Sequence, residues 1–172
     1  MKKLLLATLI TAPVLFNYTY AAESHKATDD HAITVESKLS AEQKAVYEVV
    51  SRYQDALNAG DVDTILSLYS AKSYSQWNNK TTAETTEKRR QQYSDLFKNE
   101  KFVTEFAYDS VVVNGDMAFV RTHHHPGAAV TVFKDGSKVL DYNREVFVLE
   151  KKNGDWKIVL YTFNTNPVQG ES

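Results

Sequence analysis

Three consecutive histidines, His123, His124 and His125, form the most chemically distinctive stretch of the sequence. On an extended strand His123 and His125 share one face, whereas His124 points to the other. A neutral imidazole can accept a proton near pH 7, and two imidazoles at this spacing can also hold a metal ion together. A metal would need a third ligand, for which Asp141 or Glu145 is available. We predict His123 and His125 as candidate catalytic bases and assign no metal.

The same histidines have a structural interpretation. They precede Pro126-Gly127, a dipeptide typical of turns, so the run can simply reach water where a strand ends. This alternative stays open at the level of sequence.

Arg144 is the third candidate catalytic residue. It lies in the middle of an apolar strand pattern, beside Tyr142. A half-buried guanidinium there can clamp a carboxylate or stabilise an enolate oxygen. It can equally form a structural ion pair with an acid such as Glu105 or Asp141.

Aromatic residues with polar tips are abundant, and tyrosine alone occurs 10 times. Such side chains suit the wall of a pocket for a flat, mostly apolar ligand. Ordinary packing in the core or at a dimer contact is the alternative. The predicted ligand-binding residues are Tyr74, Trp77, Tyr93, Tyr142 and Tyr161.

Length and composition favour one folded domain. The chain has 172 residues, of which 42% are hydrophobic, which is enough to bury a core. The formal charge of −2 argues against nucleic acid as a partner, because that needs a concentrated basic surface. The absence of cysteine excludes disulfides, thiolate catalysis and cysteine zinc sites. We expect no cofactor.

The N-terminal residues 1–21 predict an export signal. Lys2 and Lys3 precede an apolar segment, residues 4–16, that is too short to span a bilayer comfortably. An uncleaved anchor is the alternative. Cleavage after Ala21 would change the formal charge from −2 to −4, because two lysines leave. We expect a periplasmic or secreted protein that is not held by a membrane.

Three helices are expected in the first part of the folded region. Ser40 and Gln43 form a capping-box pattern, and Gly60 is a typical helix stop. Asp61 can cap a short second helix. Thr81 and Glu84 form a similar box, which predicts a third helix from there to about Asn99. Before these helices, residues 22–38 are polar and without periodicity, and they predict a flexible linker.

Strand patterns follow from Phe102 to the end of the folded region. Four turn signals separate five expected strands: 102–113, 117–125, 129–134, 138–151 and 156–166. A further extended piece is expected at 73–77. The Asn153-Gly154 dipeptide predicts a tight hairpin, because both positions of a type I′ turn need positive φ. Close connections of this kind favour an antiparallel meander, and helices followed by strands indicate an α+β fold.

Three segments carry a further likeness: RYQDALNAGDVDTILSLYS (52–70), VVVNGDMAFVR (111–121) and REVFVLEKKNGDWKIV (144–159). With this arrangement and these segments, the chain resembles the nuclear-transport-factor-2-like superfamily, in its SnoaL-like and ketosteroid-isomerase-like branch. The resemblance implies a cone, or cystatin-like roll, in which three N-terminal helices pack on a strongly curved antiparallel sheet. It would occupy residues 39–167, followed by a tail at 168–172.

The resemblance also sets functional expectations. Proteins of this superfamily include isomerases, dehydratases, cyclases, small-ligand binders and association domains, and many are dimers. Enzymes among them often place an acid in the turn after the first helix, where this chain has Asn58. We therefore expect a small, partly apolar ligand in the cone, with proton-transfer activity of the isomerase, dehydratase or cyclase type. The alternative is a non-catalytic homodimeric association or scaffold module.

Overall fold

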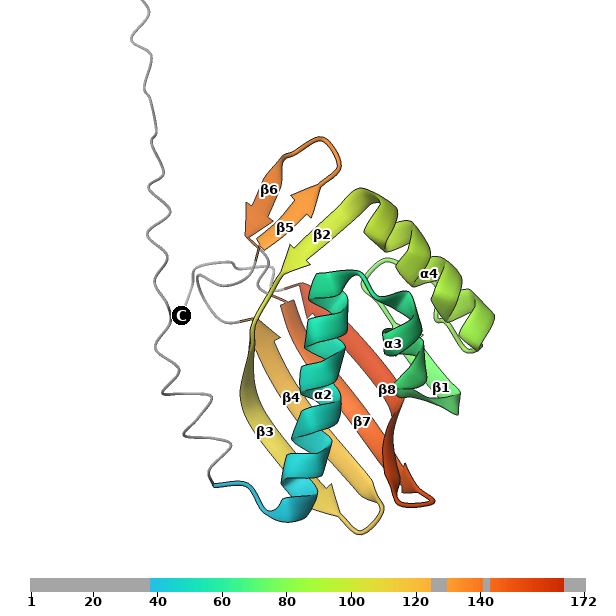
Figure 1. Cartoon of the computed structure of the whole chain (residues 1–172), viewed down its shortest axis with the longest axis vertical. Helices are drawn as coiled ribbons and strands as arrows, with labels where there is room; N and C mark the ends of the chain where they lie inside the picture. Colours follow the sequence, from blue (N-terminus) through green and yellow to red (C-terminus); the bar gives the residue numbers. More distant parts are fainter. Residues whose placement is uncertain (1–37, 125–129, 141–142, 166–172) are drawn as a thin grey trace, which may run out of the picture.

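The computed structural model describes residues 38–124, 130–140 and 143–165. Helix α2 (Ala41–Ala59) lies across one face of a five-stranded sheet, with α3 (Val62–Ser67) and then α4 (Thr86–Asn99) beside its C-terminal half (Figure 1). The expected α+β architecture, with helices packed on a largely antiparallel sheet, is confirmed. The helices in the described part of the chain are too short or too polar to cross a membrane.

Local sequence signals determine the ends of the first two helices. The Ser40 hydroxyl accepts from the Gln43 amide at 3.3 Å, and the Gln43 side chain accepts from the Ser40 amide at 3.0 Å. This is the predicted capping box. Gly60 ends α2 with φ of 68°, and Asp61 caps α3 by accepting from Thr64.

Helix α4 begins later than predicted. Its N-cap is Thr85, which accepts from the Lys88 amide at 3.2 Å, so the proposed box at Thr81 and Glu84 is wrong. The reason is a tertiary contact: the backbone of Ala83 exchanges two hydrogen bonds with Ser75, each of 3.0 Å. That bridge holds the backbone at Ala83 extended, so the helix starts only after it.

The strands form two sheets rather than one meander. The larger sheet has the order β1-β8-β7-β4-β3, in which β1 and β8 are parallel and the other neighbours antiparallel. The smaller sheet has the order β2-β5-β6. The bounds are β1 (Tyr69–Gln76), β2 (Glu100–Val103), β3 (Phe106–Asn114), β4 (Met117–His124), β5 (Val130–Phe133), β6 (Lys138–Leu140), β7 (Asn143–Lys152) and β8 (Asp155–Thr165).

Two predicted strands are therefore split. The expected strand at 102–113 breaks between β2 and β3, where Asn58 of α2 donates to Thr104 O at 2.8 Å and accepts from Thr104 N at 2.9 Å. Thr104 is thus bonded to the helix instead of a neighbouring strand. The expected strand at 138–151 becomes β6 and β7, and the break between them lies outside the described residues.

The β7–β8 hairpin forms as predicted. Asn153 and Gly154 have φ values of 54° and 90°, and Lys152 faces Asp155 across the turn. The pleat sends Phe147 and Leu149 into the core, where both are fully buried. Register shifts at Val148/Leu149 and at Tyr108/Ser110 interrupt the pairing. Bulges of this kind increase twist, which bends a sheet around the helix packed on it.

Candidate functional site: a buried acid–base pair in an aromatic cavity

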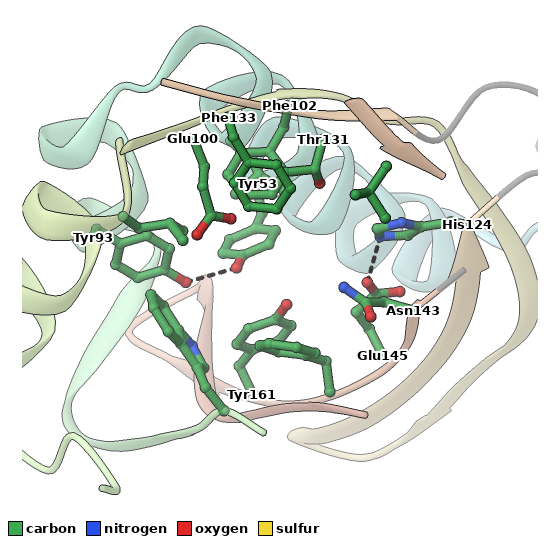
Figure 2. Close-up of a pocket in the computed structure, with 15 residues that line it drawn as sticks. Tyr53, Tyr93, Glu100, Phe102, His124, Thr131, Phe133, Asn143, Glu145 and Tyr161 are labelled. Atoms are coloured by element: carbon green, nitrogen blue, oxygen red, sulfur yellow. Dashed lines mark hydrogen bonds and ion pairs between the residues drawn. The ribbon is translucent and has the colours of Figure 1, made fainter. Parts of the chain in front are cut away.

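A cavity of about 260 Å³ lies between the inner face of the large sheet, helices α2 and α4, and the small sheet (Figure 2). Aromatic rings dominate its wall. They are Tyr53, Trp77, Tyr93, Phe102, Phe133, Tyr161 and Phe163. Helix, turn and strand residues far apart in sequence therefore meet around one partly open, mainly apolar space.

Only some of the predicted ligand-binding residues lie in the wall of this cavity. Trp77, Tyr93 and Tyr161 lie in the cavity wall and are at least nine-tenths buried. Tyr74 does not line it: its side chain is on the opposite face of β1 and is 50% exposed, because side chains alternate along a strand. Tyr142 lies outside the described residues.

A histidine and a glutamate form a close, buried polar pair in the wall. His124, the last residue of β4, lies with its Nε2 2.6 Å from Oε1 of Glu145 on β7. The other oxygen of Glu145 accepts from the Thr122 hydroxyl at 2.9 Å. All three side chains are buried, and the Phe106 ring stacks on the His124 imidazole with a centroid separation of 5.5 Å.

The predicted catalytic residues lie on the other face. His123 is half-exposed, and its Nδ1 is 2.9 Å from Oδ1 of Asp109, which also accepts from Arg121 at 3.0 Å. Arg144 faces His123 in the β4–β7 register and is exposed. Neither residue lines the cavity, which corrects the expected placement of His123 and Arg144. His125 lies outside the described residues.

The sequence contained a signal for the inward pair. Glu145 alternates with Phe147 and Leu149, which are bulky and apolar, and the structure buries all three. Correspondingly, His124 alternates with Val120 and Thr122 on β4. Identifying the more apolar face of each strand as the core would have placed both ionisable groups there.

A second polar group of the cavity consists of tyrosines. The hydroxyls of Tyr53 and Tyr93 are 2.6 Å apart, and those of Tyr69 and Tyr93 are 3.3 Å apart. Burial raises the pKa of Tyr53 and of Tyr93 well above the ordinary value of 10.0. Nearby Glu145 adds to the effect of burial on the Tyr161 pKa, which is also well above 10.0. These hydroxyls are therefore neutral hydrogen-bond donors at pH 7.

In Figure 2 the two polar groups appear on opposite sides of the cavity, with the Tyr53–Tyr93 contact on one side and the His124–Glu145 contact on the other. Asn58, at the turn position singled out above, is not in the wall because it is bonded to Thr104. Glu145 thus supplies a cavity carboxylate from a different element. Within the described ranges, no three His, Asp or Glu side chains are grouped as a metal site requires.

The comparisons with known proteins agree with this architecture. The SnoaL-like domain model matches residues 50–161, so the chain belongs to the SnoaL-like domain family. No curated protein matches the chain.

Solved structures extend the likeness at the level of fold. A ketosteroid isomerase-like protein from Erwinia carotovora atroseptica SCRI1043 is 20% identical with a TM-score of 0.69, and the match covers 76% of this chain and 100% of that one. An NTF2-like protein from Pseudomonas putida KT2440 is 12% identical with a TM-score of 0.62, covering 76% and 90%. A protein of unknown function with a cystatin-like fold from Nostoc punctiforme PCC 73102 is 17% identical with a TM-score of 0.60, covering 77% and 97%.

Proposed function

We propose that this protein binds a small, partly apolar ring compound in the aromatic cavity and transfers a proton to or from it. The observation that carries the proposal is the buried His124–Glu145 pair in the cavity wall. Proton transfer next to a carbonyl is the step shared by isomerases, dehydratases and cyclases. Membership of the SnoaL-like family is consistent with ligand binding and with activity of this kind.

The geometry suits a general acid–base pair. A contact of 2.6 Å between His124 and Glu145 lets the carboxylate orient the imidazole and stabilise its protonated form. Thr122 in turn fixes the carboxylate, so the pair is held without help from a ligand. Burial excludes the water that would otherwise compete for the proton.

The wall defines the class of ligand. Aromatic side chains dominate it, and the cavity of about 260 Å³ is slightly smaller than the range usual for drug-sized ligands. The expected ligand is therefore compact, built of one or two rings. Tyrosine hydroxyls opposite the acid–base pair would bind an oxygen atom on it.

Exchange of carbon-bound hydrogen in deuterated buffer tests the proposal without knowledge of the natural substrate. The probe is 2-tetralone, a two-ring ketone with acidic protons beside its carbonyl. Proton NMR should show faster exchange with the folded protein than with buffer, and Glu145→Gln should lose at least about 100-fold of this acceleration. No acceleration by the wild type, or full acceleration by Glu145→Gln, would overturn the assignment.

We further propose that the mature protein works outside the cytoplasm, in the periplasm or after secretion. The apolar segment at 4–16 after Lys2 and Lys3 supports this. Mass spectrometry of protein taken from the periplasmic fraction should show a chain that begins at Ala22. A chain that keeps Met1 and sediments with membranes would support an anchor instead.

The outer face of the large sheet favours a second candidate function, homodimeric association. Val112, Phe119, Val148 and Leu160 lie in register across four of its five strands, β3, β4, β7 and β8. Val112 is 51% exposed and Phe119 is 41% exposed. A row of apolar side chains on a sheet face is what a self-associating surface requires.

A further inference from the structure

Arg89 is an unusual residue in this core because it is charged and almost completely buried, with 1% of its side chain exposed. Its described partners are neutral. It donates to Ser75 Oγ and to Ser73 O at 2.9 Å each, contacts Ala83 O at 3.4 Å, and lies 4.0 Å from the centre of the Tyr69 ring. Among the described residues, no carboxylate pairs with it. A cation with only neutral partners is costly to bury, so Arg89 calls for an explanation beyond packing.

Arg89 stands at one end of a row of hydroxyls that reaches the cavity. Its Nε donates to Ser75 Oγ, and Ser75 donates to Tyr69 Oη at 3.2 Å. Tyr69 contacts Tyr93, and Tyr93 contacts Tyr53 at the distances given above. Tyr53 and Tyr93 are both cavity residues. The row therefore connects a fixed positive charge to the place where a ligand would lie.

The direction of the hydrogen bonds follows from Arg89. A guanidinium only donates, so Ser75 must accept from it and can pass its own hydrogen to Tyr69. We assign the remaining hydrogens from the network: all find acceptors when Tyr69 donates to Tyr93 and Tyr93 to Tyr53. The Tyr53 hydrogen is then left for the cavity side, where the hydroxyl of Tyr161 also interacts with Tyr53, so a ligand oxygen would replace Tyr161 as the acceptor. Hydrogen bonds aligned in this way strengthen one another.

We propose that Arg89 is a positioning residue that polarises this row, so that Tyr53 donates to a ligand oxygen that carries or gains negative charge. The ligand class that fits is a ring compound with a phenolic oxygen or an enolisable carbonyl. This inference rests on the ligand binding proposed above. It assigns a task to Arg89 and the tyrosines that the His124–Glu145 pair cannot perform, namely stabilising charge on oxygen while a proton moves at carbon.

The other ionisable groups of the cavity affect the same ligand. Glu100 and Glu145 disfavour a negative charge there, and a protonated His124 favours it. All of them remain when Arg89 or Ser75 is changed. A difference between variants therefore isolates the contribution of the row.

The probe is 4-nitrophenol, whose hydroxyl ionises near neutral pH and whose phenolate absorbs visible light. The matched neutral compound is 4-nitrotoluene. Both should quench the fluorescence of Trp77 in the cavity wall, which gives their affinities. Visible absorbance gives the ratio of bound phenolate to bound phenol. Arg89→Met removes the charge, Ser75→Ala interrupts the row, and Arg90→Met is the control because Arg90 is exposed and pairs with Asp63.

We expect the ratio of bound phenolate to bound phenol to fall about tenfold in Arg89→Met and less in Ser75→Ala, with an unchanged affinity for 4-nitrotoluene. Arg90→Met should match the wild type. A merely structural role would weaken both compounds together, and that result overturns the inference, as does an equal ratio in all proteins. If Arg89→Met fails to fold, the ratio of bound phenolate to bound phenol in Ser75→Ala alone tests the inference. Failure of the wild type to bind either compound would instead overturn the ligand-binding function itself.

Discussion

Two adjacent histidines on β4 show how differently the two faces of this sheet are used. His123 is half-exposed and pairs with Asp109 beside Arg121, in contact with water. His124 is buried and pairs with Glu145 in the cavity wall. The residue types are the same, and only the pleat separates them. The chemistry of a histidine on this strand is therefore decided by the face it occupies rather than by its neighbours in sequence.

The largest expected contrast concerns two phenylalanines. Phe147 is fully buried on the inner face, whereas Phe119 is 41% exposed on the outer face. Phe147→Ala should lower the free energy of unfolding by about 4 kcal/mol, because it leaves a cavity in the core. Phe119→Ala should lower it by less than about 1 kcal/mol. Urea unfolding measures both, and similar losses would contradict the assignment of inner and outer faces.

The buried and the exposed ion pair should also differ in how much each contributes to the free energy of unfolding. Glu145→Ala leaves His124 buried without its carboxylate and should cost about 3 kcal/mol of unfolding free energy. Asp109→Ala removes a pair at the water-exposed face and should cost at most about 1 kcal/mol. Urea unfolding at pH 7 is again the measurement. An equal cost would mean that the His124–Glu145 pair is hydrated rather than enclosed.

The inner tyrosines should make stability depend on high pH. Burial raises the pKa of Tyr53 and Tyr161 above 10.0 in the folded protein, whereas unfolding returns each to its ordinary value. Their contribution to the free energy of unfolding is complete below pH 10. It is lost as the pH rises above this value, by about 1.4 kcal/mol per pH unit for each tyrosine. In the double variant Tyr53→Phe, Tyr161→Phe, the free energy of unfolding should fall less steeply between pH 10 and pH 11 than in the wild type. Tyr74→Phe, at a half-exposed position, should leave it unchanged.

The smallest effect on the fold, and the sharpest on assembly, is expected from a charge on the outer face. In the isolated subunit, Phe119→Asp should lower the free energy of unfolding by at most about 1 kcal/mol, because Phe119 is 41% exposed there. If the apolar row mediates homodimers, this variant should be a monomer by native mass spectrometry while the wild type is a dimer. A wild-type monomer, or a variant that stays dimeric, would remove the outer face as the association surface.

The sequence is most informative where structure is decided locally. The capping box at Ser40 and the positive φ values at Asn153 and Gly154 need only neighbouring residues, and both were predictable. The start of α4 was not, because the bridge between Ser75 and Ala83 comes from tertiary contacts. The strand break near Thr104 likewise depends on Asn58, 46 residues away.

The site was only partly predictable for the same reason. Aromatic residues such as Trp77 and Tyr93 indicated a pocket, and alternation separated His123 from His124. Which face points inward is decided by the pairing of β4 with β7, across the intervening β5–β6 hairpin. The burial of Arg89 could not be predicted, because the sequence of its helix is mostly charged and polar. The partners that bury Arg89 come from other elements.

The measurement that tests the central claim most directly compares the neighbouring histidines in the 2-tetralone exchange assay. His124→Ala removes the imidazole of the cavity, whereas His123→Ala removes the one on the outer face. The account predicts that His124→Ala loses at least about 100-fold of the acceleration and that His123→Ala retains it. Loss in His123→Ala with retention in His124→Ala would place the chemistry on the other face of the sheet and contradict the account.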